Sequence, residues 1–185
     1  MQGFEAVERS VLVFTRWFSV AWQILVFRQG PQDLPGGREW TAMAAALYLL
    51  SGFLLLQVRG ISGEALLMLA VDLGLVLVFV TLVLRFSGRG ERLWQSLQAL
   101  WLCGAVLNAI ALPFAPVLAN PPGEPTVWLD LAVVMSLALI FWSIGLMGQV
   151  FRHALEWPLG RALLLSLAYA VGNILIHYHL FAPNG

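Results

Sequence analysis

The sequence predicts an all-α fold: a polytopic membrane bundle of five transmembrane helices, preceded by an N-terminal interfacial amphipathic helix. The first observation is composition, because 60% of the 185 residues are hydrophobic and only 11% are charged. A soluble domain carries about 25% charged residues, so this chain has too little charge to cover a water-facing surface. The second observation is a series of apolar runs of roughly 20 residues, the length at which a helix crosses a bilayer.

The segment 4–27 is apolar, but its polar residues recur at spacings of three, four and seven, along one face of a helix. If this helix crossed the bilayer, Arg16 would lie near the centre at a cost of at least about 2.5–3.5 kcal/mol. In the interface, arginine side chains can face lipid head groups, so we favour an interfacial helix. A spanning helix is the alternative. The residues assigned to the interfacial helix are Arg9, Arg16, Trp17 and Trp22.

The whole chain, 1–185, is predicted to form a single integral membrane domain. A linker at 28–39 follows the first helix, and its prolines and glycines force turns. Short polar or Gly/Pro-rich breaks separate the later apolar runs. These runs predict spans at about 40–58, 62–84, 93–112, 127–151 and 159–181.

The arginines predict the orientation of the spans. All ten basic residues are arginines, and nine of them fall before the first span or in the second-to-third and fourth-to-fifth loops. The opposite side has only Arg59. Because positive charge is retained on the cytoplasmic side, we expect a cytoplasmic N-terminus and an external C-terminus. This orientation predicts a multi-pass protein of the bacterial inner (cytoplasmic) membrane.

Three polar residues inside the spans form a candidate polar layer: Asp72, Asn108 and Asn173. Asp72 lies about ten residues, or roughly 15 Å, below the outer surface, and the two asparagines lie at or somewhat above that depth. Polar groups at such depth are costly, and proton-coupled carriers hold a titratable group in a layer of this kind. The competing interpretation is that these residues tie helices together, through hydrogen bonds that average only about 0.6 kcal/mol.

A second polar group is predicted near the outer surface. Carboxylates and imidazoles can together bind a divalent metal. However, His177 and His179 are two residues apart and point in nearly opposite directions on a helix, so we expect no metal there. The candidate outer polar cluster comprises Glu64, Asp130, His177 and His179.

The remaining site chemistry is largely excluded by the sequence. The one cysteine, Cys103, rules out an internal disulfide, and His153 lies roughly 30 Å from the other histidines, too far for haem ligation within the chain. No G-x-S-x-G turn or glycine-rich phosphate motif occurs. We therefore expect a non-enzymatic protein with no catalytic residue, no metal and no cofactor. Zero net charge gives no indication of nucleic-acid binding.

The linker run Gly-Pro-Gln-Asp-Leu-Pro at 30–35 resembles a segment of small bacterial multi-span proteins of unassigned function. The five-span plan and the turn at 152–162 are similar to those of the Yip1-like family. The resemblance lies in the sequence pattern of the last three spans. It implies a membrane-organising or partner-binding role and transfers no active-site residues.

The sequence thus leads to two functional hypotheses. The first is a non-enzymatic integral membrane protein that acts through partners, as a small subunit, scaffold or assembly factor. Its expected partners are the lipid bilayer and other membrane-protein subunits, or further copies of the chain. The second is a small oligomeric transporter or channel whose path passes Asp72, Asn108 and Asn173.

Overall fold

A computed structural model describes the backbone of residues 2–181 and the side chains of residues 14–181. The regular secondary structure of this part of the chain is all helical, with no strand, and five of its helices are long and apolar enough to cross a membrane. The predicted all-α class, with five spans and an N-terminal helix, is confirmed. The long helices are α1 (Gln2–Leu25), α2 (Arg38–Val58), α3 (Ala65–Phe86), α4 (Leu93–Ala111), α6 (Val127–Leu155) and α7 (Leu159–Phe181).

The helix ends follow ordinary backbone chemistry. Thr126 caps α6, because its hydroxyl accepts a hydrogen bond of 3.2 Å from the backbone N–H of Leu129. Gly60 and Gly88, just beyond α2 and α3, have φ of 78° and 69°, a conformation that favours glycine. Past α4, prolines begin the 3₁₀ turn Leu112–Phe114 and the short α5 (Ala115–Ala119), where a missing N–H is tolerated.

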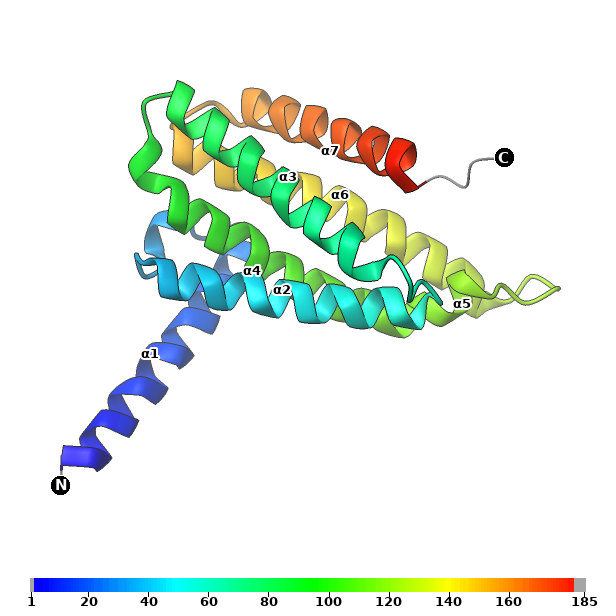
Figure 1. Cartoon of the computed structure of the whole chain (residues 1–185), viewed down its shortest axis with the longest axis horizontal. Coiled ribbons are helices and arrows are strands. Elements are labelled where there is room, and N and C mark those ends of the chain that lie inside the picture. Colours follow the sequence, from blue (N-terminus) through cyan, green and yellow to red (C-terminus); the bar gives the residue numbers. More distant parts are fainter. Residues whose placement is uncertain (1, 182–185) are drawn as a thin grey trace.

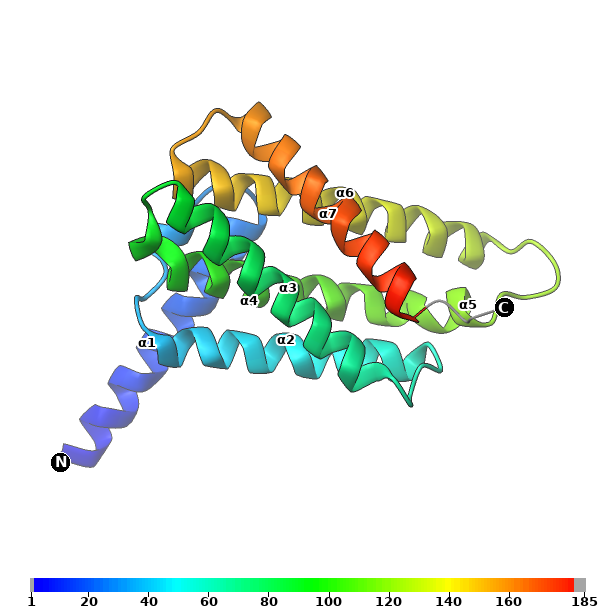
Figure 2. The same ribbon diagram turned by 45° about the horizontal axis from the view of Figure 1, so that its top comes forward.

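Helix α4 forms the centre of the bundle. Every residue from Ser96 to Cys103 on it is buried, so this stretch is covered on all sides. Helices α2 and α6 flank it, α3 lies over α2 and α4, and α7 crosses obliquely over α6 (Figures 1 and 2). The buried stretch of α4 therefore contacts neighbours on every side and forms the core of the bundle.

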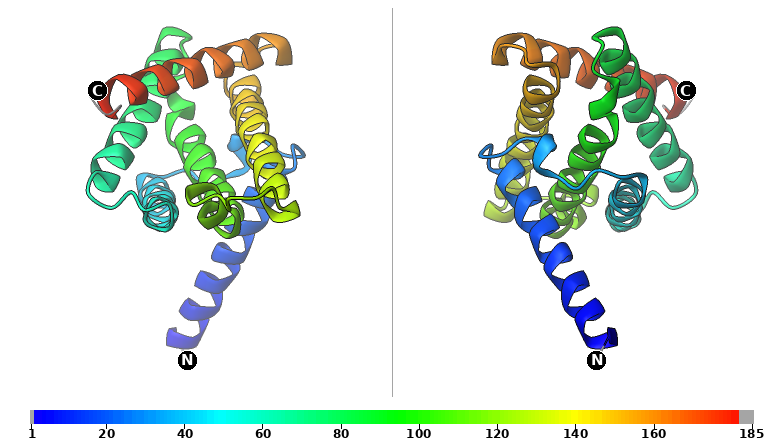
Figure 3. Two further views of the ribbon diagram at one scale, coloured as in Figure 1. Left: turned by 90° about the vertical axis from the view of Figure 1, so that its right-hand side faces the viewer. Right: turned by 90° about the vertical axis from the view of Figure 1, so that its left-hand side faces the viewer.

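Helix α1 combines a buried side with an exposed one. Trp17 and Ile24, on the side facing α4, are 1% and 0% exposed. Near its C-terminal end, Trp142 on α6 donates a hydrogen bond of 3.0 Å from its indole N–H to the carbonyl of Leu25. The N-terminal half extends away from the bundle (Figure 3). The exposed side carries an aromatic row, Phe14, Phe18 and Trp22.

The sequence predicts an interfacial helix over 4–27, and the structure buries part of its apolar side. Leu25 is buried in the bundle, and Trp17, assigned to the interface, packs against Trp40 at 5.4 Å between ring centroids. Arg16 and Trp22 are exposed as an interfacial helix requires, while the side chain of Arg9 lies outside the described residues. The placement of α1 in the membrane interface stays a prediction.

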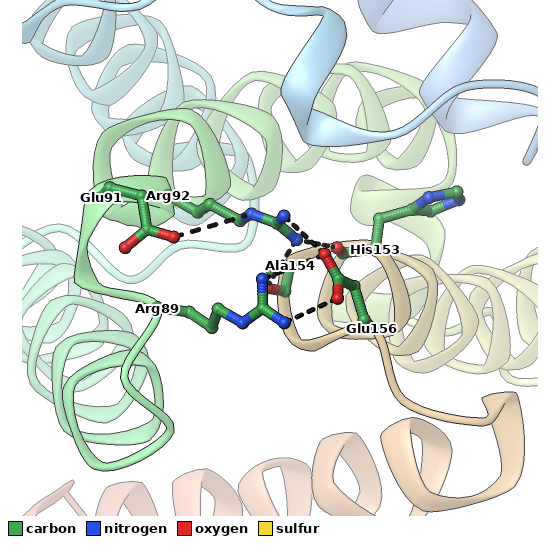
Figure 4. A network of polar contacts seen from close by, with 6 residues as sticks. All are labelled: Arg89, Glu91, Arg92, His153, Ala154 and Glu156. Atoms are coloured by element: carbon green, nitrogen blue, oxygen red, sulfur yellow. Dashed lines mark hydrogen bonds and ion pairs between the residues drawn. The ribbon is translucent and has the colours of Figure 1, made fainter.

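The loops on one side of the bundle are fastened together at what we call the arginine-rich end. It comprises the linker after α1, the α3–α4 loop and the α6–α7 loop. Arg89 and Arg92 each place a guanidinium nitrogen 2.6 Å from the carboxylate of Glu156 (Figure 4). Arg92 also donates to the last carbonyls of α6, those of His153 and Ala154. This cluster joins two loops 64 residues apart in sequence.

Glu156 follows the last residue of α6 with φ 57° and ψ 35°, the left-handed conformation in which glycine is the usual residue. A non-glycine residue in this conformation costs of order 1 kcal/mol. Its carboxylate accepts hydrogen bonds from both arginines, which lower the pKa of Glu156 below its ordinary value; the bond from Arg92 has the larger effect.

Candidate functional site

Asp72 lies in the N-terminal half of α3, and both of its carboxylate oxygens accept hydrogen bonds from other helices. Asn173 on α7 donates to Oδ1 at 2.8 Å, and the hydroxyl of Tyr48 on α2 donates to Oδ2. The side chain of Asp72 is 21% exposed. Helices α2, α3 and α7 therefore meet at one acid, and Asn173 on α7 lies 101 residues beyond Asp72 in the sequence.

Helix α7 supplies a row of polar side chains to this acid. Tyr169, Asn173 and His177 recur at intervals of four, which places them on one face of the helix. Asn173 donates a second hydrogen bond, of 3.0 Å, to the hydroxyl oxygen of Tyr169. His177 lies with Nε2 4.0 Å from Oδ1 of Asp72. The row thus places a phenol hydroxyl, an amide and an imidazole along one side of the site.

Asn108, the third residue of the predicted polar layer, lies beside this cluster rather than in it. Its side-chain amide donates to the hydroxyl of Ser51 at 3.3 Å, and Ser51 donates to the carbonyl of Tyr48 one turn earlier on α2. The structure therefore brings Asp72 and Asn173 into direct contact and places Asn108 on a neighbouring wall, where it ties α4 to α2.

Two cavities adjoin the acid. The larger, of about 370 Å³, lies among the middle turns of α4, α6 and α7. The smaller, of about 190 Å³, lies toward the opposite end from the arginines, between α2, α3 and α4, and Asn108 and His177 line it. Tyr48 and Asp72 line both cavities. Their hydrogen bond therefore lies between the two spaces.

The walls of the larger cavity are mainly apolar. Ser143 and Ser166 line it, but each hydroxyl donates to a carbonyl in the preceding turn of its own helix, at 2.7 Å and 2.9 Å. Trp101 also lines it, and its buried indole N–H has no hydrogen-bond partner among the described residues. Asp72 is the one carboxylate among the described residues that line this cavity. Most of the other lining side chains are aromatic or aliphatic.

The predicted outer polar cluster is not gathered at one point. His177 contacts Asp72, whereas Glu64, Asp130 and His179 are exposed on three different elements. Within residues 14–181, no three His, Cys, Asp or Glu side chains lie close enough together to hold a metal ion. The separation follows from helix geometry, since His179 points away from the face that carries His177.

The sequence analysis missed both tyrosines of the site. Tyr48 is ten residues from the start of α2, and Tyr169 is ten from the start of α7. Each tyrosine is an apolar ring with a polar tip, and a buried hydroxyl needs a partner. A tyrosine in mid-span at the depth of an intramembrane acid was the signal that could have identified them.

Comparison of the chain with protein-family models, with curated proteins and with solved structures found no match. The resemblance to the Yip1-like family therefore stays a prediction, and the function is argued from the geometry of the site.

Proposed function

We propose that this integral membrane protein is a small carrier of the bacterial cytoplasmic membrane in which Asp72 binds the transported proton. The observation that carries the proposal is the position of the Tyr48–Asp72 hydrogen bond, which borders two cavities at once. In a carrier, a central binding group must be reached in turn from two sides. A group that borders both spaces is placed for that task.

The chemistry of the acid supports the same proposal. An ionisable side chain inside a span is costly, and such residues commonly mark ion or substrate paths. Asp72 accepts hydrogen bonds on both carboxylate oxygens, from Asn173 and from Tyr48, so the structure keeps this costly group in a defined position between three helices. Asp72 also lies next to His177, a second group that can bind and release a proton, at 4.0 Å.

The test is proton entry into vesicles that contain the purified protein. Vesicles loaded with a pH-sensitive dye are given an inside-negative potential with valinomycin and K⁺. We expect faster acidification than in protein-free vesicles, lost in Asp72→Asn and kept in the matched control Asp130→Asn, which removes an exposed acid at the start of α6. Equal rates for wild type and Asp72→Asn would reject the carrier.

A second function is favoured by helix α1: a non-enzymatic role through a membrane partner, as a subunit, scaffold or assembly factor. Phe14, Phe18 and Trp22 form an exposed aromatic row, 44%, 50% and 58% exposed, on a helix whose N-terminal half leaves the bundle. Aromatic residues are enriched where protein surfaces bind one another. The partner that we propose is another membrane protein or a second copy of the chain.

Photo-crosslinking in intact membranes tests this second function. A photoreactive amino acid at position 18 should give a discrete protein adduct. The lipid-facing control carries the same photoreactive group at position 164 on α7. Leu164, which it replaces, is 69% exposed. Adducts to lipid alone from both positions would reject the partner role.

A further inference from the structure

We infer that the larger cavity binds a hydrophobic organic cation, held by Asp72 and by the aromatic side chains around it. The inference rests on the proposed proton carrier and names the class of solute that shares Asp72 with the proton. Three observations lead to it: the charge around Asp72, the aromatic lining and the size of the space.

The first observation is an acid without a permanently charged partner. Among the described residues, the one ion-pair partner within 4.0 Å of the Asp72 carboxylate is His177. The arginines of the spanning helices lie at their ends: Arg38 begins α2, Arg85 and Arg152 are in last turns, and Arg161 is in a first turn. Away from water, a carboxylate is stable when a cation or a proton neutralises it. The site is therefore suited to an incoming positive charge.

The second observation is the aromatic lining. Tyr48, Trp101 and Tyr169 all line the larger cavity together with Asp72. The face of an aromatic ring attracts a cation, by about 0.5–2 kcal/mol depending on how far the pair is removed from water. A carboxylate combined with several rings favours a diffuse organic cation over a small metal ion, which requires several oxygen ligands.

The third observation is size and polarity. The cavity measures about 370 Å³, within the range of roughly 300–1,000 Å³ that is usual for pockets for drug-sized ligands. Leu100, Leu107 and Met147 are among its apolar lining residues. Such walls gain free energy by covering the apolar groups of a ligand. Together these features select a bulky ammonium or phosphonium ion with aromatic or aliphatic substituents.

The experiment is equilibrium binding of radiolabelled tetraphenylphosphonium to the purified full-length protein in detergent. We expect saturable binding in the wild type and at least about tenfold weaker binding in Asp72→Asn, equivalent to about 1.4 kcal/mol. Asp72→Glu, which keeps the charge, should retain most of the affinity. The matched control Asp130→Asn should bind as the wild type does.

A neutral ligand of similar shape, triphenylphosphine oxide, separates charge recognition from partition into an apolar cavity. We expect it not to compete with the cation at equal concentration, and this comparison needs only the wild-type protein, even if Asp72→Asn fails to fold. Equal competition, or equal cation binding by wild type and a folded Asp72→Asn, would overturn the inference.

The vesicle assay keeps the two proposals separate. Proton entry that depends on Asp72, without binding of tetraphenylphosphonium, would leave the carrier standing and refute the cation. Binding that depends on Asp72, without proton entry, would support the cation site and count against the carrier.

Discussion

Gly104 on α4 lies against the ring of Tyr48 on α2, so closely that a Cβ on Gly104 would be 2.8 Å from the ring atom Cε2. The ring is held in the position from which its hydroxyl reaches Asp72. The absence of a side chain at position 104 is therefore part of the candidate site.

Gly104→Ala should displace the Tyr48 ring and weaken its hydrogen bond to Asp72. We expect several-fold slower proton entry in vesicles and weaker binding of tetraphenylphosphonium. Gly74→Ala is the matched control, because a Cβ on Gly74, on the same helix as Asp72, meets nothing within 4 Å. Unchanged flux and binding in Gly104→Ala would show that Tyr48 does not position the acid.

Trp17→Ala should destabilise the protein strongly. Trp17 is 1% exposed, and its indole N–H lies beside the side-chain amide of the buried Gln98, which accepts a hydrogen bond from it when the amide oxygen faces the indole. Removing a buried tryptophan side chain costs about 3–5 kcal/mol. A large fall in the thermal unfolding midpoint in detergent is expected.

Trp22→Ala is the matched comparison on the same helix. Trp22 is 58% exposed, so its removal should change the free energy of unfolding by less than about 0.5 kcal/mol. Equal destabilisation by the two substitutions would contradict the packing of α1 against the bundle.

The cluster of Glu156 with Arg89 and Arg92 predicts a dependence of stability on pH. Hydrogen bonds from Arg92, and then from Arg89, lower the pKa of Glu156 in the folded protein. A carboxyl whose folded pKa is depressed stabilises the fold above its unfolded pKa of about 4.3, and this contribution is lost as pH falls through the folded pKa.

Thermal unfolding midpoints measured between about pH 6 and about pH 3 test this dependence. The difference in unfolding midpoint between wild type and Glu156→Gln should be largest near the upper pH limit and should shrink as the pH is lowered. Glu91→Gln is the control, since Glu91 is more exposed and lies 4.0 Å from the Nε of Arg92. A difference that stays constant with pH would exclude the ion pairs as its source.

Reporter fusions test the proposed orientation. Alkaline phosphatase, which is active only outside the cytoplasm, should be active when fused after Phe181 and inactive when fused in the loop at Gly88. The expectation follows from the arginine distribution in the sequence. Activity at Gly88 and not after Phe181 would reverse the topology and the direction of the proposed carrier.

Much of the fold could be predicted because lipid imposes a simple requirement on sequence. The predicted spans 40–58 and 159–181 correspond to α2 (Arg38–Val58) and α7 (Leu159–Phe181). In lipid, the backbone N–H and C=O groups of a span must form hydrogen bonds within the helix. A long apolar run bounded by glycine, proline or a charged residue is therefore expected to form a transmembrane helix. The end of α6 was placed at 151 and lies at Leu155, because Arg152 and His153 continue the helix beyond the apolar run.

The pairing of helices could not be predicted in the same way. Apolar side chains facing lipid and facing protein look alike in sequence, so nothing marked Trp17 as buried and Trp22 as exposed. Asp72 and Asn173 were singled out because polar residues at depth are rare. The oblique crossing of α7 brings Asn173 into contact with the acid. A single sequence does not show how helices cross, so it could not predict which asparagine would make this contact.

The packing of α1 against the bundle constrains the order in which the helices assemble. Its C-terminal end is held by Trp142 on α6, and Phe27, just beyond it, packs against Gly145. These contacts require residues that leave the ribosome more than a hundred positions later. Helix α1 can therefore pack on α2 and α4 early, but the contacts at its C-terminal end form only after the fourth span has been synthesised.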